Sequence, residues 1–157
     1  MKKMLVGIDD SAAAMKAVEY VAEQFAGAKD VEISLVHVLP NLPAIFWDEG
    51  HILAEDEKRD RKKVVDKWLA DRKAKMEPML KKAADLLAAK GVPPGSIRTT
   101  FLSDSTDVAD SLIEEARDKG FRTIVVGRSH HSPKQVLGTI AGRVAGQGSG
   151  LAVTIVE

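Results

Sequence analysis

Short apolar runs alternate along the chain with longer segments whose apolar residues recur every three or four positions. The runs lie at residues 4–8, 31–39, 97–102, 121–126 and 151–156. Each run has the length and composition of a buried strand, and the segments between them have the spacing of amphipathic helices. Strands that alternate with helices pair in parallel through right-handed crossovers. The sequence therefore predicts an α/β fold, with a doubly wound five-stranded parallel sheet and helices on both faces, in a single domain over residues 1–157.

Polar residues and proline predict how these helices begin and end. Ser11 or Asp10 follows the first strand and is a good N-cap for the first helix, because a short side-chain oxygen can accept from free amides of the first turn. Asp104 or Thr106 is expected to cap the helix after the third strand. Pro78 lies within a long helical pattern, where the helix is expected either to kink or to restart.

A charged helical segment spans about residues 52–90. Between Glu55 and Lys82 it holds 11 basic and 7 acidic residues, with apolar residues at helical spacing among them. This excess of positive charge is either a surface for an acidic partner or the solvated face of an extended helix with i,i+4 ion pairs. The second interpretation is favoured, because alternating charges are usual on a solvated helix face.

Composition narrows the class of protein. The 157 residues include 23 Lys and Arg against 23 Asp and Glu, and no cysteine. A chain without cysteine has no disulfide, thiol nucleophile or Cys-ligated metal, and it fits a reducing compartment. Zero net charge argues against nucleic-acid or anionic-membrane binding. No long uncharged window and no secretory signal are present. We expect a cytoplasmic protein that binds neither nucleic acid nor membrane.

The segment after the fourth strand carries the candidate chemistry. In doubly wound sheets, ligands bind beyond the carboxyl ends of the strands. Gly127 follows the fourth strand, and the segment from there to Ile140 opens a helix. Glycines let the backbone approach an anion, and a helix N-terminus favours negative charge. On these residues alone, a phosphate-binding loop and a tight turn without ligand are equally good interpretations.

The order and spacing of several motifs resemble the universal stress protein family over all 157 residues. These motifs are Asp9-Asp10-Ser11, Val36-His37-Val38, Val125-Val126-Gly127, Gly138-Thr139 and the closing Val153-Thr154-Ile155-Val156. The resemblance implies a sheet in the order 3-2-1-4-5. It also implies an adenine-nucleotide pocket between the first and fourth strands in one branch of the family, and dimers joined through the last strand, residues 151–156.

The resemblance also assigns site residues by matching position. Asp9 would face the base or ribose, and Val38 would offer backbone contacts to adenine. The phosphates would be surrounded by Gly127, Arg128, Gly138 and Thr139. The nucleotide-binding branch has Gly-x-x-Gly, nine residues, then Gly-Ser or Gly-Thr. Here His130 stands at the second glycine, and only residues 131–137 precede Gly138.

This departure leaves three functions open. The first is a dimeric stress-response binding module, not an enzyme, whose adenine-nucleotide-type pocket resembles the branch that does not hold ATP. The second is a competent ATP or AMP sensor, in which the Arg128 guanidinium replaces lost backbone contacts to phosphate. The third is a slow hydrolase that uses Asp9 with Mg²⁺ and a nucleotide. No resident metal is expected, because the adjacent His130 and His131 rarely converge on one ion.

Overall fold

A computed structural model describes residues 1–39, 54–103, 107–128 and 139–157. In chain order the elements are β1 (Lys2–Gly7), α1 (Ala12–Gln24), β2 (Val31–Val38), α2 (Glu55–Ala89), η2 (Pro94–Ser96), β3 (Ile97–Leu102), α3 (Val108–Asp118), β4 (Thr123–Gly127), α4 (Thr139–Gln147) and β5 (Ala152–Val156). The five strands form one parallel sheet in the order β3-β2-β1-β4-β5. This confirms the predicted fold class and the order 3-2-1-4-5.

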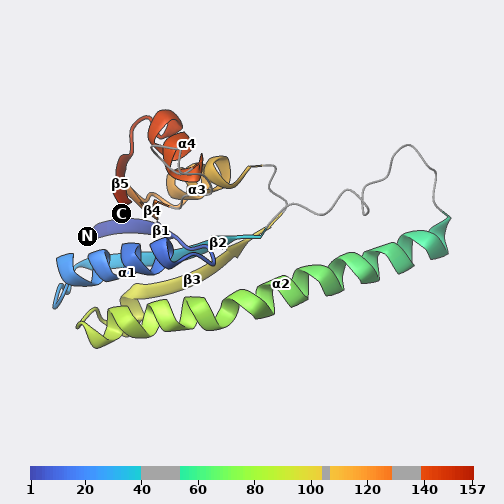
Figure 1. Ribbon diagram of the computed structural model, residues 1–157, viewed down its shortest axis with the longest axis horizontal. Coiled ribbons are helices and arrows are strands. Elements are labelled where there is room, and N and C mark those ends of the chain that lie inside the picture. Colours follow the sequence, from blue (N-terminus) through green and yellow to red (C-terminus); the bar gives the residue numbers. More distant parts are fainter. Residues whose placement is uncertain (40–53, 104–106, 129–138) are drawn as a thin grey trace.

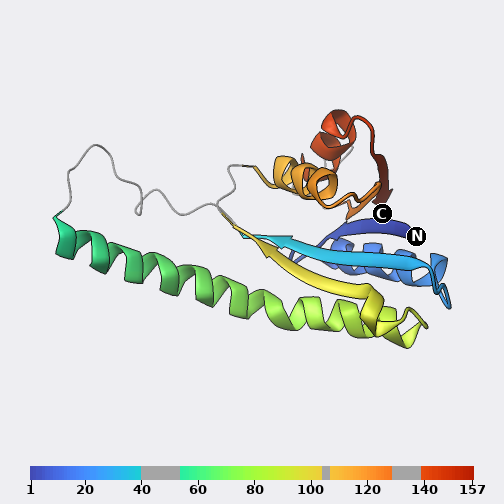
Figure 2. The same cartoon turned by 180° about the vertical axis from the view of Figure 1, so that it is seen from behind.

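Helices cover both faces of this sheet. Figure 1 shows α1 and α2 on one face and α3 and α4 on the other, and Figure 2 shows the same layers from behind. The chain crosses from one face to the other between β3 and β4, so the strand order reverses between β1 and β4. A crevice forms at such a reversal, beyond the carboxyl ends of the two central strands.

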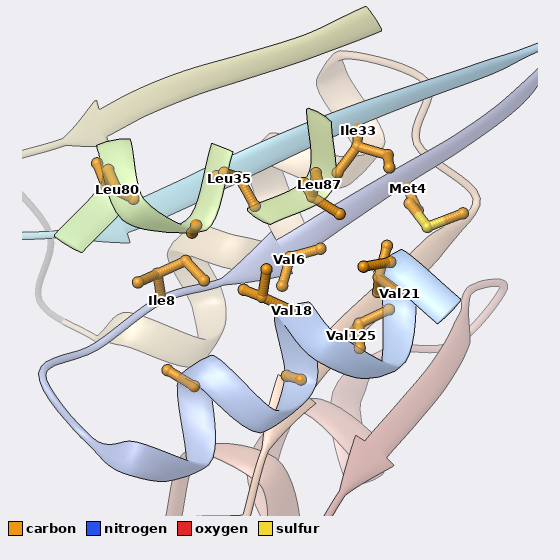
Figure 3. Close-up of a cluster of buried hydrophobic side chains, with 14 of the residues drawn as sticks. Met4, Val6, Ile8, Val18, Val21, Ile33, Leu35, Leu80, Leu87 and Val125 are labelled. Carbon is orange, nitrogen blue, oxygen red and sulfur yellow. The ribbon is translucent and has the colours of Figure 1, made fainter. Parts of the chain in front are cut away.

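The alternation of side chains along each strand builds two separate cores. In β1, Met4 and Val6 point to the face with α1 and α2, whereas Leu5 points to the face with α3 and α4. Figure 3 shows the first core, where Val18 of α1 and Leu87 of α2 meet the side chains of β1 and β2. Strands buried on both faces read as continuous apolar runs, which is why the sequence pattern located them.

The helix starts agree with the expectations in part. Ser11 is the N-cap of α1, and its side-chain oxygen accepts from the amide of Ala14. The expectation of Asp104 or Thr106 as the cap of α3 is wrong, because Asp107 holds that position and accepts from the amide of Asp110 at 3.0 Å. Asp107 lies immediately before the first helical residue, so its carboxylate reaches the third amide of the helix.

The charged segment predicted at about residues 52–90 forms helix α2. It runs without a break from Glu55 to Ala89 and includes Pro78, so the helix does not restart at that proline. Its buried side chains are Met76, Leu80, Ala83 and Leu87, all in the second half. Residues 55–75 have no buried side chain, and this first part of the helix extends past the sheet (Figure 1). This part of the helix is therefore exposed in the single chain, as both interpretations of the charged segment require.

Candidate functional site

The turn after β1 fixes the side chain of Asp9. Its Oδ1 atom accepts hydrogen bonds from the Ser11 amide, at 2.9 Å, and from the Ser11 hydroxyl. The Ser11 oxygen in turn accepts from the amide of Ala14 at 3.2 Å and caps α1. The second carboxylate oxygen of Asp9, Oδ2, accepts no hydrogen bond from a described residue. Asp9 is therefore held rigidly by one oxygen, while the other is available to a ligand.

A hollow lies beyond the carboxyl ends of β1, β2 and β4. Its lining residues are Gly7, Ile8, Asp9, Ala14, Val36, His37, Val38, Val108, Leu112, Val126, Gly127 and Ile140. The cavity volume is about 90 Å³. That is below the range of roughly 300–1,000 Å³ of typical small-molecule pockets, so only part of a ligand fits inside. The walls are apolar, and Asp9 and His37 bring the polar side chains.

Three of the predicted site residues meet in this hollow. Asp9 comes from the end of β1, Val38 from the end of β2 and Gly127 from the end of β4. Val38 is buried, with 6% of its surface exposed, and it lines the hollow. They lie together because the carboxyl ends of neighbouring parallel strands meet at one edge of a sheet.

Gly127 has a packing role as well as a place at the hollow. A Cβ atom at this position would lie 2.8 Å from the amide nitrogen of Ala14, and still closer to the carbonyl of Ala13. The first turn of α1 therefore passes directly against the end of β4, and only glycine leaves it room. The close approach of helix and strand therefore accounts for a glycine at this position without any ligand.

Arg128 points away from the hollow that it was predicted to serve. Its guanidinium pairs with the carboxylate of Glu157, and its amide donates to the carbonyl of Val156 at 2.7 Å. The Nε atom of Arg128 is buried and has no hydrogen-bond partner among the residues that the structure describes. Arg128 is not among the residues that line the hollow. Any contact of Arg128 with a ligand phosphate must compete with Glu157.

Two predicted phosphate contacts remain, Gly138 and Thr139. Gly138, together with His130 and the shortened loop, falls outside the described residues. Thr139 is the first residue of α4, and Ile140, which follows it, lines the hollow. The N-terminus of α4 therefore begins at the edge of the site, as the resemblance implied for the helix after the loop.

His37 and the helix residues of the wall were absent from the predicted site. The Nδ1 atom of His37 lies 2.7 Å from the carbonyl oxygen of Ile8, and its ring meets Phe101 edge-on at 6.0 Å. The motif Val36-His37-Val38 contributed to the resemblance, but it gave no direction for the imidazole. Val108, Leu112 and Ile140 are ordinary apolar positions of α3 and α4, and nothing in their spacing distinguishes wall from core.

The described residues hold no other candidate chemistry of these kinds. None of their His, Asp and Glu side chains gather in a group of three that could bind a metal ion. Within the same ranges, no helix is both long and apolar enough to cross a membrane.

Comparison with known proteins places this geometry in a family. The family model described as the universal stress protein family matches residues 1–150. The chain belongs to the universal stress protein family. No curated protein matches its sequence. Three of the motifs on which the resemblance rested contribute residues to the hollow: Asp9-Asp10-Ser11, Val36-His37-Val38 and Val125-Val126-Gly127.

Solved structures of universal stress proteins share the fold at low sequence identity. A family member from Burkholderia pseudomallei is 21% identical with a TM-score of 0.68, and the match covers 99% of this chain and 95% of that one. A structure from Archaeoglobus fulgidus in complex with dAMP is 18% identical with a TM-score of 0.61, covering 100% and 98%. A family protein from Arabidopsis thaliana with AMP bound is 17% identical with a TM-score of 0.64, covering 99% and 91%.

Proposed function

We propose that this universal stress protein is a cytoplasmic stress-response module that binds an adenine nucleotide mainly through its adenosine part. The observation that carries the proposal is the convergence of Asp9, Val38 and Gly127 on one apolar hollow. An apolar wall suits the flat faces of a purine, and a few fixed polar groups give orientation. The Oδ2 atom of Asp9 is suited to accept hydrogen bonds from ribose hydroxyls. The family members solved with dAMP and AMP support this choice of ligand.

The phosphate side is proposed to contribute little affinity. Arg128 is paired with Glu157, so a phosphate gains its guanidinium only by displacing a carboxylate. His130 also replaces the glycine through which the binding branch would bring backbone amides to a phosphate. The remaining contacts would come from Gly127, Gly138 and Thr139. We therefore expect adenosine, AMP and ATP to bind with similar affinity.

Calorimetric titration tests this proposal. The protein is titrated with adenosine, with AMP, and with ATP in the presence of Mg²⁺. Similar saturable heats for all three support adenosine recognition. Much tighter binding of ATP would favour the competent sensor instead, and phosphate release that is lost in Asp9→Asn would favour the hydrolase. No heat at millimolar ligand would contradict nucleotide binding altogether.

A matched pair of variants locates the ligand. Asp9→Asn keeps a side-chain oxygen for the contacts with Ser11 and removes the charge, and a hydrogen bond to a charged group is worth about 1.5–3 kcal/mol. We therefore expect AMP affinity to fall by about tenfold or more in this variant. Asp10→Asn is the control, because Asp10 is exposed and does not line the hollow. Equal effects of the two variants would contradict the site.

We also propose that the module is a homodimer through residues 151–156. Strand β5 is at one edge of the sheet. The Ala152 amide donates to the carbonyl of Arg122, and the Val156 carbonyl accepts from the amide of Arg128, so the backbone groups of Ala152 and Val156 face β4. Backbone groups alternate along a strand, so those of Val153 and Ile155 point outward. An antiparallel pair of β5 strands about a two-fold axis at Thr154 would satisfy them. Light scattering at micromolar concentration tests this interface: a monomer contradicts it, and Thr154→Lys should lower the mass because it removes the β5 contact.

A further inference from the structure

The opposite edge of the sheet, strand β3, also has unpaired backbone groups. The carbonyl of Leu102 accepts from the amide of Leu39 at 2.8 Å, so Leu102 faces β2. Because backbone direction alternates, Arg98 and Thr100 also face β2, whereas Ile97, Thr99 and Phe101 face outward. The Ile97 amide donates to the carbonyl of Pro94. The other outward amides and carbonyls have no hydrogen-bond partner among the described residues.

A groove of about 600 Å³ runs along this edge, between β3 and α2. The side chains of Ile97, Thr99 and Phe101 form one wall. Leu80, Ala84 and Ala88 of α2 also line it, and charged side chains of α2 surround these apolar residues: Lys73, Glu77, Lys81 and Asp85. Lys81 and Asp85 already form an ion pair at 3.1 Å. The two alanines leave space below the strand edge, where side chains of an added strand would lie.

We propose that this edge binds the β3 strand of a second copy of the chain, antiparallel, about a two-fold axis at Thr99. A second copy presents the same outward groups at Ile97, Thr99 and Phe101, so a two-fold axis at Thr99 pairs each edge with its own complement. In such a pair, Thr99 and its copy exchange amide-to-carbonyl hydrogen bonds, and the Phe101 amide of each copy donates to the Ile97 carbonyl of the other. The Phe101 carbonyl would face the Ile97 amide of the other copy, which already donates to the carbonyl of Pro94 in its own chain. Every free amide on the edge thus finds an acceptor.

The side chains are also self-complementary in this register. Residues directly opposite each other point to the same face, so Ile97 of one copy meets Phe101 of the other, and Thr99 meets Thr99. Pairs of an aromatic with a β-branched residue, and pairs of threonines, are favourable across strands. These side chains would fill the grooves of both copies above Ala84 and Ala88. Thr99 is exposed, so no described part of its own chain covers the axis.

This interface is independent of the proposed nucleotide site and of the proposed β5 dimer, because β3 and β5 lie at opposite edges of the sheet. Two different two-fold interfaces on opposite edges do not close on a dimer. A chain that uses both edges therefore grows past the dimer as its concentration rises, whereas a chain that uses one edge stops there.

Light scattering on edge variants tests the proposal. Wild-type protein is expected to exceed the mass of a dimer as its concentration rises. Thr99→Lys places like charges opposite each other at the axis, without burying anything in the monomer, and should stop growth at the dimer. Thr99→Lys with Thr154→Lys should give monomer. Ala70→Lys adds the same charge on an exposed part of α2 outside the groove and should leave the mass unchanged.

Hydrogen exchange on the wild-type protein gives a readout that does not depend on any variant. The amides of Thr99 and Phe101 should exchange rapidly in dilute protein and slow by about tenfold or more as concentration rises, because pairing protects them. The amides of Thr100 and Leu102, bonded to β2, should be slow throughout. Rapid exchange of Thr99 and Phe101 at every concentration would overturn the proposal. An unchanged mass in Thr99→Lys would overturn it as well.

Discussion

The imidazole of His37 binds the carbonyl oxygen of Ile8, with 2.7 Å between Nδ1 and that oxygen. A carbonyl only accepts, so Nδ1 carries the proton and Nε2 does not in the neutral ring. This bond joins the end of β2 to the end of β1, beside Asp9. The side chain therefore holds together two of the strand ends that form the hollow.

Replacement of His37 should test this link. His37→Leu removes the donor and leaves the Ile8 carbonyl without it, so we expect a loss of about 1–3 kcal/mol in the free energy of unfolding. His37→Gln keeps an N–H donor near the same place and should recover part of that loss. Urea denaturation measures both. Equal stability of the leucine variant and wild type would show that the bond contributes nothing to stability.

The close approach at Gly127 predicts a strong effect of a single methyl group. Gly127→Ala places a carbon against the backbone of Ala13 and Ala14, which cannot move without displacing α1, so we expect a loss of several kcal/mol, at least about 3. Gly146→Ala is the matched control. It lies within α4 with nothing within 4 Å of a new Cβ, and should be neutral or stabilising by about 0.5–1 kcal/mol. Thermal unfolding distinguishes the two.

Pro78 predicts a gain in stability on substitution. Proline has no amide hydrogen, so it cannot donate to the carbonyl of Ala74 within α2, and an interior proline costs about 3 kcal/mol. Pro78→Ala should therefore raise the free energy of unfolding by about 1–3 kcal/mol. In Pro94→Ala the proline removed lies at the start of η2, where its fixed φ is favourable, so no gain is expected. A loss of stability in Pro78→Ala, measured by urea denaturation, would contradict this account.

The ion pair between Arg128 and Glu157 predicts how strongly the protein binds ATP relative to adenosine. Glu157→Gln frees the guanidinium, so affinity for ATP should rise by a few-fold relative to adenosine, by about threefold or more. Arg128→Met in the Glu157→Gln background should abolish that difference. Calorimetric titration of both ligands measures the ratio. An unchanged ratio in Glu157→Gln would mean that Arg128 takes no part in phosphate binding.

The sequence predicted the sheet well because each strand is a short, mainly apolar run, and the three inner strands are largely buried. Runs such as residues 31–39 have no polar face to confuse the pattern, and the structure places β2 at Val31–Val38. Capping was less certain: Asp107 caps α3, while the earlier Asp104 and Thr106 were expected to do so. Several short polar residues stood before that helix, and only the backbone geometry of each decides which one can reach an amide.

Residues of the candidate site at strand ends could be predicted from the sequence. The orientation of their side chains could not. Asp9, Val38 and Gly127 were assigned by the resemblance, and all three lie at strand ends that line the hollow. Arg128 does not line it, because its orientation depends on Glu157, which lies far along the chain at the end of the neighbouring strand. The hydrogen bond from His37 to Ile8 likewise depends on the pairing of β1 with β2.

The length of α2 sets up a gradient of stability along a single helix. Its 35 residues span about 50 Å, whereas the six residues of β3 span about 20 Å, so much of the helix has no sheet beneath it. The first half has only exposed or half-buried side chains, and ion pairs such as Lys58 with Glu55 give it little. Turns near Glu55 can therefore unwind and re-form while those near Leu87 stay closed. A protease that cuts after lysine and arginine should cleave the first half of α2 before the core unfolds.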